Sequence, residues 1–508
     1  MKRIGAILIC LTLAAIYLIL LPTEVQAATE YEENGYMYTV TDSAATITRV
    51  YRPFAGDVTL PSMLGGYSVK KIGAQAFSSC NNLTSVIIPG SVQTIEYGAF
   101  INCDDLVSVV ISDGTRTIGS HAFANCFALA TVTIPGSVRQ IGDSAFRACK
   151  SLKSVIIPES VITLGNSAFS GCDALTNVTI GSGVTAIGVC AFERCIALTD
   201  ISIPDSVERI GEMAFYNCAG LSKVIIGDGV NTIDPYAFYS CSSLKNVEFG
   251  MAVKVIDEFA FTYCNFADVV LPEGVTSIGV NTFSYNENLE DVELPSSLTR
   301  VHAFAFDGCK KLNYKCFDGG KYLGNKSNPY MVLIGTEDKA LTSCEVHTDT
   351  KLIGNNAFMS CDSLVSVTLP KGIRVIGDGA FYECSHLAAV YFNGGHKDWM
   401  RLVIGSGNED FDCATIVEEY AGCLHKWDEN VIKKAPTCST IGTNTYTCAT
   451  CGETLTKEMG GMVAHSYADG RCTICGEAEP IEEESLGFFA AIVKFFEDLF
   501  RSLLWFLY

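Results

Sequence analysis

Eight cysteines and histidines between residues 421 and 478 are the side chains of this chain best suited to chemistry. They are Cys423, His425, Cys438, Cys448, Cys451, His465, Cys472 and Cys475. Cys448 and Cys451 form one C-x2-C pair and Cys472 and Cys475 form a second, with twenty residues between the pairs, a spacing typical of a zinc ribbon. Four such ligands around one ion leave no open position, so the predicted zinc is structural.

The other four residues, Cys423, His425, Cys438 and His465, are candidate additional ligands, and eight ligands would fill two zinc sites. A glycine follows each C-x2-C pair and lets the backbone turn beneath a metal. A segment this short buries too little apolar surface to fold alone, and a metal would hold it together. A module held by disulfides is the alternative, because the chain begins with an export signal, described below.

Catalytic patterns are absent from the sequence. It contains no G-x-S-x-G, no H-E-x-x-H and no glycine-rich phosphate loop, and its seven histidines are scattered. The formal net charge is −21, from 56 acidic and 35 basic residues, which disfavours binding to polyanions. The sequence therefore predicts a protein that is not an enzyme and does not bind nucleic acid.

One repeat dominates the rest of the chain. A template close to L-x-x-V-x-I-P-x-x-V-x-x-I-G-x-x-A-F-x-x-C-x-x occurs thirteen times between Phe77 and Phe381, and nine copies in a row follow one another at 23 residues. A fixed period of about 20–29 residues predicts a leucine-rich solenoid, in which each coil buries its apolar side against its neighbours. The V-x-I part alternates and predicts a short strand, so stacked coils form a parallel β ladder on the concave face, with short helical or 3-10 segments elsewhere.

The cysteines of the repeat occupy a single slot, three residues after its phenylalanine. They are Cys80, Cys103, Cys126, Cys149, Cys172, Cys195, Cys218, Cys241, Cys264, Cys309, Cys361 and Cys384. A slot repeated on this schedule is a packing position, where free cysteine acts as a small hydrophobic residue. Asn286 fills the slot in one coil, which fits a buried turn better than a required disulfide.

The A-F-x-x-C motif after L-x-x-V-x-I-P resembles the leucine-rich repeats of BspA-like bacterial surface proteins, over about residues 30 to 420. The cysteine-rich pieces after Glu418 look more distantly like modules appended to other bacterial surface proteins. The first resemblance implies an exported or surface protein with an adhesive role, which recognises host or bacterial macromolecules. A structural spacer or self-associating envelope component is the alternative, different in class.

Composition shifts divide the chain into seven predicted segments. These are a signal peptide (1–27) cleaved near Ala27, a β-rich cap (28–70), leucine-rich repeats (71–312), a non-repeat island (313–350), the last repeats with a C-terminal cap (351–420), the cysteine-rich module (421–478), and an acidic linker with an apolar tail (479–508). The island predicts hairpin-like strands that bulge from the solenoid. Trp399 is expected to pack over the last layer of the core. The tail predicts an amphipathic helix that binds a membrane surface, a partner or a second copy.

The middle residue of V-x-I should point to solvent on every strand. This column contains Ile87, Val110, Thr133, Ile156, Thr179, Ser202, Ile225, Glu248, Val270, Glu293, Thr368 and Tyr391. Its early members are mostly β-branched and uncharged, and acidic residues appear later. An apolar stripe on an exposed sheet is a candidate protein-binding surface, although β-branched residues also suit strands for their own sake.

Overall fold

The computed structural model describes residues 29–51 and 54–420, with backbone alone for 419–420 and for six short strand segments between 423 and 472. The chain forms two compact units. The larger contains the described residues up to Val390 together with Lys397–Ala414, and the smaller contains Tyr391–His396 and the described residues from Thr415 onward.

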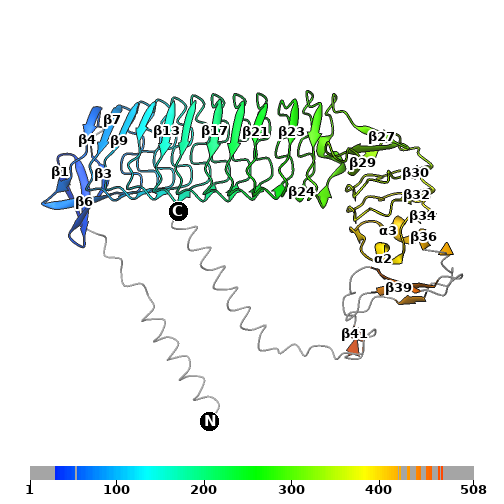
Figure 1. The fold of residues 1–508 in the computed structure, drawn as a ribbon. Helices are drawn as coiled ribbons and strands as arrows, with labels where there is room; N and C mark the ends of the chain where they lie inside the picture. Colours follow the sequence, from blue (N-terminus) through cyan, green and yellow to red (C-terminus); the bar gives the residue numbers. More distant parts are fainter. Residues whose placement is uncertain are drawn as a thin grey trace, which may run out of the picture. The chain divides into compact units, whose positions relative to one another are not determined.

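The coils of the larger unit add strands to a row of short parallel sheets, whose solvent side we call the strand face (Figure 1). The strands are β4 (Gly56–Thr59), β7 (Leu83–Ile88), β9 (Ser108–Ile111), β11 (Thr131–Thr133), β13 (Ser154–Ile157), β15 (Asn177–Ile180), β17 (Asp200–Ile203), β19 (Lys223–Ile226), β21 (Asn246–Glu248), β23 (Asp268–Val270), β25 (Asp291–Glu293) and β32 (Ser366–Leu369). Val155 and Ile157 of β13 are buried while Ser154 and Ile156 are exposed, as period-two alternation requires.

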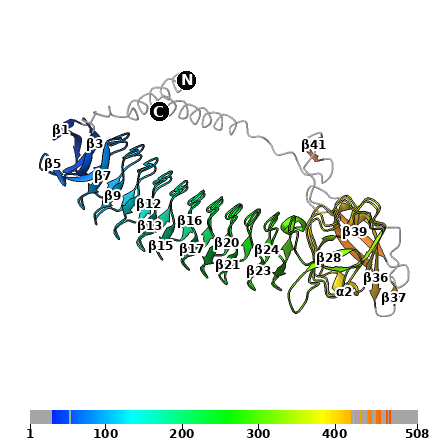
Figure 2. The same cartoon turned by 90° about the horizontal axis from the view of Figure 1, so that it is seen from above.

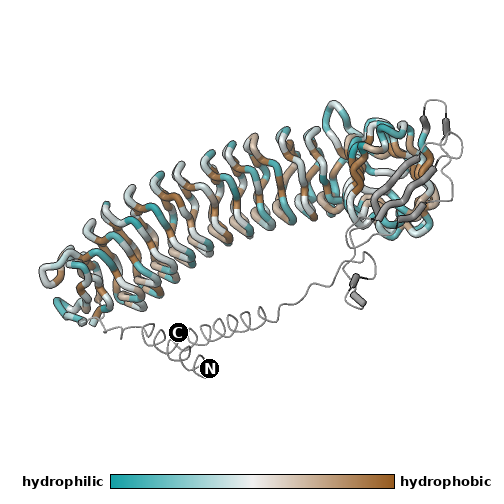
Figure 3. The backbone as a smooth tube through the Cα atoms, turned by 90° about the horizontal axis from the view of Figure 1, so that it is seen from below, coloured by the Kyte–Doolittle hydropathy of each residue, from teal (hydrophilic) through white to brown (hydrophobic). Residues whose placement is uncertain are grey.

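A second parallel ladder lies on the other side of the coils and consists mostly of two-residue strands. They are β6 (Tyr67–Ile72), β8 (Thr94–Ile95), β10 (Thr117–Ile118), β12 (Gln140–Ile141), β14 (Thr163–Leu164), β16 (Ala186–Ile187), β18 (Arg209–Ile210), β20 (Thr232–Ile233), β22 (Val255–Ile256), β24 (Ser277–Ile278), β26 (Arg300–Val301), β31 (Leu352–Ile353), β33 (Val375–Ile376) and β35 (Val403–Ile404). Successive coils lie side by side in Figure 2, and Figure 3 shows hydrophobic residues recurring along each of them. The predicted solenoid with a parallel ladder is confirmed.

The phenylalanines of the template form a continuous stack inside the coils. From Phe77 to Phe306, neighbouring rings are nearly parallel, with centroids 4.8 to 5.5 Å apart. The small residue before each ring is buried with it, alanine as in Ala122 and Phe123, or threonine at Thr282 before Phe283. Turns rather than helices carry this wall in most coils, and the short 3-10 segment η1 (Ala303–Phe306) appears in one. Offset stacking of this kind adds to the free energy gained by burying the rings.

The cysteine slot is buried, and its thiols are free. In ten coils the thiol donates to the carbonyl oxygen of the phenylalanine 26 residues earlier, as Cys126 does to Phe100 at 3.2 Å. Each thiol therefore satisfies a backbone carbonyl inside the core as well as filling space. The packing interpretation of the twelve cysteines agrees with this geometry.

Six strands lie before or beside the first coil: β1 (Glu30–Glu33), β2 (Tyr36–Thr41), β3 (Ala44–Val50) and β5 (Met63–Leu64), together with β4 and β6. β1, β2 and β3 pair antiparallel, and β3 then pairs in parallel with β6. Tyr36 and Phe54 stack at 4.8 Å, and both approach Phe77. These strands cover the first coil's edge, which would otherwise offer unpaired backbone groups.

Only the first half of residues 313–350 departs from the ladders. β27 (Lys315–Phe317), β28 (Gly320–Leu323) and β29 (Val332–Thr336) pair antiparallel, as the expected hairpins do. β29 also pairs in parallel with β31, and β30 (Ser343–Glu345) pairs in parallel with β32. The expectation that the whole island bulges is therefore wrong for β29 and β30. Cys344 fills a buried valine slot there, so the repeat resumes earlier than its spacing suggests.

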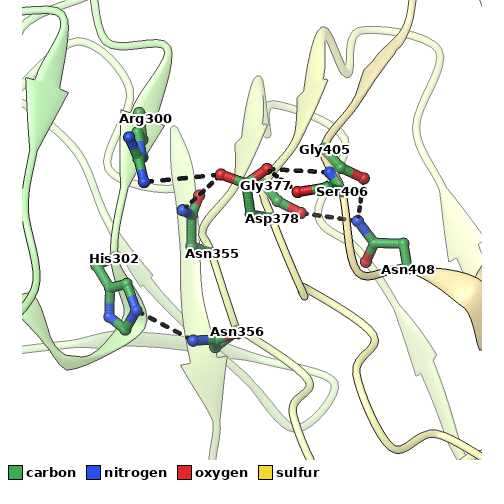
Figure 4. A network of polar contacts seen from close by, with 9 residues as sticks. All are labelled: Arg300, His302, Asn355, Asn356, Gly377, Asp378, Gly405, Ser406 and Asn408. Atoms are coloured by element: carbon green, nitrogen blue, oxygen red, sulfur yellow. Dashed lines mark hydrogen bonds and ion pairs between the residues drawn. The ribbon is translucent and has the colours of Figure 1, made fainter. Parts of the chain in front are cut away.

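The coils before and after the interruption are joined directly. A parallel bridge links His302 with Asn355, and His302 also contacts the Asn356 side chain at 3.0 Å (Figure 4). Asp378 accepts hydrogen bonds from the Asn355 side chain at 3.2 Å and from the Ser406 backbone at 3.0 Å, and Arg300 lies 3.8 Å from it. Burial and the nearby Arg300 charge lower the pKa of His302, so a neutral imidazole is favoured at this junction.

The larger unit ends on α2 (His396–Trp399) and α3 (Glu409–Cys413). Phe411 of α3 stacks on Phe381 at 4.8 Å and so extends the phenylalanine stack, and Trp399 lies against Phe411 at 6.3 Å. Trp399 is 4% exposed. The expected packing of Trp399 at this end is confirmed, with Phe411 as the layer between.

The smaller unit is built from antiparallel pairs. β34 (Ala389–Phe392) begins in the larger unit and ends in the smaller one. β36 (Thr415–Tyr420) pairs antiparallel with β37 (Cys423–Leu424). β38 (Ile432–Lys434), β39 (Gly442–Thr447) and β40 (Thr454–Met459) form a three-stranded sheet, and β41 (Tyr467–Ala468) pairs with β42 (Arg471–Cys472). Buried Glu418 lies 3.5 Å from the His396 ring.

Candidate functional site: the strand face

The predicted column lies on the solvent side of the strands. Ten of its twelve residues are exposed, and Glu293 and Thr368 are half-buried. Exposure reaches 68% at Ile156 and 58% at Val270, which is high for apolar side chains in the middle of strands. These side chains add nothing to the core.

Strand register places neighbouring members of the column directly beside one another. The paired positions are Ile87 with Val110, Val110 with Thr133, Ile156 with Thr179, Ser202 with Ile225, Ile225 with Glu248, and Val270 with Glu293. Thr368 pairs with Glu345, and Tyr391 is exposed in the smaller unit. The register thus assembles scattered residues into stripes along the face.

The sequence interpretation missed a second column, two residues earlier on each strand. It begins with half-buried Ser85 and Ser108 and continues with exposed Thr131, Ser154, Asn177, Asp200, Lys223, Asn246, Asp268 and Asp291. Period-two alternation would have found it, because both outward positions of a four-residue strand face solvent. Thr59, which pairs with Ile87, and Glu345 were missed because the template is incomplete around them.

The chemistry of the face changes along the array. From β7 to β15 the two columns carry serine, threonine, asparagine, valine and isoleucine, whereas from β17 to β25 charged residues appear. Lys223 and Glu248 form an ion pair across neighbouring strands at 2.7 Å. One end of the face is therefore uncharged, with polar and apolar side chains mixed, and the other is charged and mostly acidic.

Three hollows follow one another over the charged half. A hollow of about 570 Å³ lies over Ser202, Ile225 and Glu248, and one of about 270 Å³ lies over Glu248 and Val270. The largest, about 680 Å³, lies where β23 and β25 meet the island, and it includes Val270 and Glu293. Ligand pockets commonly measure about 300–1,000 Å³. The predicted column thus runs through concave surface in this half.

The largest hollow has an acidic wall and a basic wall. Asp268, Glu290 and Asp291 line the strand side, and Lys315 and Lys326 line the island side. Lys326 forms an ion pair with Glu293, whose hydrogen-bonding carboxylate raises the pKa of Lys326. Asn325 fixes the island loop against the ladder by donating to the Leu294 carbonyl oxygen at 3.0 Å.

The predicted zinc ligands lie mostly outside the described residues. His425, Cys438, Cys448, Cys451, His465 and Cys475 are among those outside, and Cys423 and Cys472 lie on β37 and β42, where only backbone is described. In the described part of the chain, no three histidine, cysteine, aspartate or glutamate side chains cluster as a metal site. The predicted signal peptide and the predicted helix of the tail also lie outside it, and within it no helix has the length and hydropathy needed to span a bilayer.

Parallel ladders, a phenylalanine stack and an outward strand face define a leucine-rich repeat solenoid. The family model for the BspA type leucine-rich repeat region matches residues 70–199, 185–313 and 337–399, more than half of the chain. The chain belongs to this family.

Solved structures of similar proteins include other leucine-rich repeat proteins. A leucine-rich cell surface protein from Faecalibacterium prausnitzii is 28% identical, with 74% of this chain and 97% of that chain covered and a TM-score of 0.41. A leucine-rich repeat protein from Bacteroides ovatus is 23% identical, with 77% and 100% covered and a TM-score of 0.49. A search of curated proteins found no match.

Proposed function

We propose that this chain is an exported cell-surface binding protein, or adhesin, that recognises host or bacterial macromolecules with its strand face. Membership of the BspA type family supports a surface role. The observation that carries the proposal is the exposed column from Ile87 to Glu293, because the register aligns its side chains without any use for them in the core.

A protein ligand suits this face best. Ile87, Val110, Ile156, Ile225 and Val270 are all exposed apolar side chains on it. Ile87 and Val110 are register neighbours, and apolar surface bordered by polar residues marks protein interaction sites. Strand propensity alone could explain the β-branched residues of the column. It does not explain why hollows lie along the column, whereas a ligand-binding role does.

Export and attachment complete the proposal. Residues 1–27 would act as a signal peptide cleaved near Ala27, and residues 486–508 would bind an envelope surface or a second copy. Structural zinc would hold the module at 421–478, with Cys448, Cys451, Cys472 and Cys475 as its first ligands. These parts rest on sequence pattern alone.

Surface plasmon resonance tests the function. The purified chain is passed over immobilised extracellular matrix proteins and over bacterial cell-surface preparations. Saturable binding to a defined protein supports the proposal. No saturable binding, together with self-association that is lost when residues 486–508 are deleted, would favour the structural spacer instead.

A further inference from the structure

β25 is hydrogen-bonded to a strand on one side only, as β11, β15 and β21 are, but at β25 the next coil places no strand of the face beside it. Toward β23, the Asp291 backbone N–H donates to the Ala267 carbonyl at 3.5 Å, and the Leu271 N–H donates to the Glu293 carbonyl at 3.1 Å. On the opposite side, two bonds mark where the next strand should lie. They run from the Asn313 N–H to the Glu290 carbonyl at 3.0 Å and from the Leu294 N–H to the Gly324 carbonyl at 2.9 Å.

Val292 lies between those two bonds without a partner of its own. Alternate residues of a strand in a parallel ladder bond to opposite neighbours, so its N–H and C=O face away from β23. No group among the described residues bonds to them there. The Val292 side chain is buried in the core at 9% exposure, and yet Val292 lines the 680 Å³ hollow. Its backbone is therefore the part that faces the hollow.

The chain's own next segment does not fill this place. By the repeat spacing, Lys315 would take the buried valine slot beside Val292, and burying an unpaired ammonium group is costly. Lys315 is instead exposed on β27, which pairs with β28. The hollow is thus a missing rung of the ladder, closed at its ends by Asn313 and Gly324 and roughly 13 Å long at about 3.3 Å per residue.

The acidic side chains beside the missing rung indicate which kind of peptide would bind there. Asp268 and Asp291 are register partners, and both are exposed. Lys326 on the opposite wall forms its ion pair with Glu293, and Asp291 adds to the field that raises the pKa of Lys326 without an ion pair of its own among the described residues. Like charges on neighbouring strands destabilise a sheet. A cationic side chain at the next position of this column would relieve the repulsion.

We propose that the missing rung binds a short extended peptide segment of a partner protein, carrying lysine or arginine beside Asp291 and an apolar residue between its basic ones. The peptide backbone bonds to the N–H and C=O of Val292, as in strand addition to an open sheet edge. The apolar side chain replaces the valine that the repeat lacks here. This inference rests on the proposed function and names the partner class for one part of the face.

Saturation-transfer NMR on the full chain tests it, because the method detects weak ligands. The probes are acetyl-Lys-Val-Lys-amide, the same peptide with the nitrogen of its second lysine methylated, and acetyl-Glu-Val-Glu-amide. In a parallel rung the N–H of the residue after the valine donates to the Val292 carbonyl, so this methyl group removes that bond. The first should bind, and the other two should bind at least tenfold more weakly. The double variant Asp268→Asn, Asp291→Asn should weaken the first peptide at least tenfold. Asp200→Asn, at the same position of β17, should leave its affinity unchanged.

Equal binding of the methylated peptide would overturn the inference, as would no binding of the first peptide or an equal loss with Asp200→Asn. Failure here is distinguishable from failure of the proposed function. A chain that binds a matrix protein through the uncharged half of the strand face but binds no peptide refutes only the missing-rung site. A chain that binds neither refutes both.

Discussion

The side-chain amide of Asn286 donates to the Phe261 carbonyl oxygen at 2.9 Å, in the slot where other coils place a thiol. It also donates to the Phe283 carbonyl at 2.8 Å, and Asn286 is fully buried. One asparagine thus performs the hydrogen bonding that cysteine performs elsewhere. The slot requires a small buried donor, and a disulfide is not part of its role.

Replacing Asn286 tests this requirement. Asn286→Leu removes the side-chain donor to the buried Phe261 carbonyl, while the Phe283 carbonyl keeps the Cys309 thiol as a donor, and the free energy of unfolding should fall by about 1–3 kcal/mol. Asn286→Cys restores a donor and should lose clearly less. Denaturant unfolding of both variants, followed by circular dichroism, gives the comparison. Equal losses would show that the slot needs only volume.

The buried thiols make stability depend on alkaline pH. Burial raises the pKa of Cys172, Cys218 and Cys384 to about 12. Unfolded thiols ionise near ~8.5, so the unfolded state loses these protons first as the pH rises. The stability is therefore fully present below about 8.5 and falls between that pH and about 12. The unfolding midpoint should drop steeply from pH 8 to pH 10.

Thiol labelling at pH 8 provides a second measurement on the same groups. Exposed Cys316 and Cys413 should react with iodoacetamide in the folded chain, and the twelve thiols of the repeat slot should react only after denaturation. Mass spectrometry of the labelled peptides distinguishes the two sets. Repeat cysteines that stay unlabelled after denaturation without reductant would be disulfide-bonded, which would contradict the packing account.

Asp378 should anchor the coils that follow the interruption. Asp378→Ala removes acceptors for Asn355 and Ser406 (Figure 4), and a loss of about 1–2 kcal/mol is expected because Asp378 is half exposed. Asp362→Ala serves as control, since the Asp362 carboxylate accepts one exposed bond from Ser385 and the His386 contact is to the Asp362 backbone carbonyl, which alanine keeps. Hydrogen exchange should rise in β31 and β33 for the first variant and not for the second.

Metal analysis tests the zinc prediction for residues 421–478. The purified chain should contain one or two equivalents of zinc, and a double Cys448→Ser, Cys451→Ser variant should lose at least one. Thiol counting on the denatured chain supplies the control. No zinc, together with missing free thiols in this segment, would establish the disulfide alternative.

Much of the fold could be predicted from the sequence because the same strand, turn and core positions recur in every copy of the template. The strand column, the phenylalanine stack and the cysteine slot all follow from one template. The structure of the interruption, residues 313–350, was harder to predict. Lys315 stands where the template has a buried valine, which explains why the ladder breaks. Cys344 stands at the same template position after the break, so the resumed repeat could not be recognised from the sequence.

Contacts between residues distant in sequence could not be predicted from periodicity. Phe411 joins the phenylalanine stack through α3 and carries no repeat motif. His302 meets Asn355 because the intervening segment folds aside, which no local pattern records. The unpaired N–H and C=O of Val292 could not be predicted either, because they result from the absence of a strand beside β25 on that side.

The most direct test of the strand face compares two substitutions in one coil. Ile156 is 68% exposed on β13, and Ile162 is 52% exposed on the turn before β14 (Thr163–Leu164). Both Ile156→Ser and Ile162→Ser should change stability by less than about 0.5 kcal/mol, because neither side chain is in the core. Affinity for the protein captured by the parent chain should fall about tenfold for Ile156→Ser and stay unchanged for Ile162→Ser, as burying an isoleucine at an interface contributes about 1.5–3 kcal/mol. Equal affinities for the two variants would contradict recognition through this face.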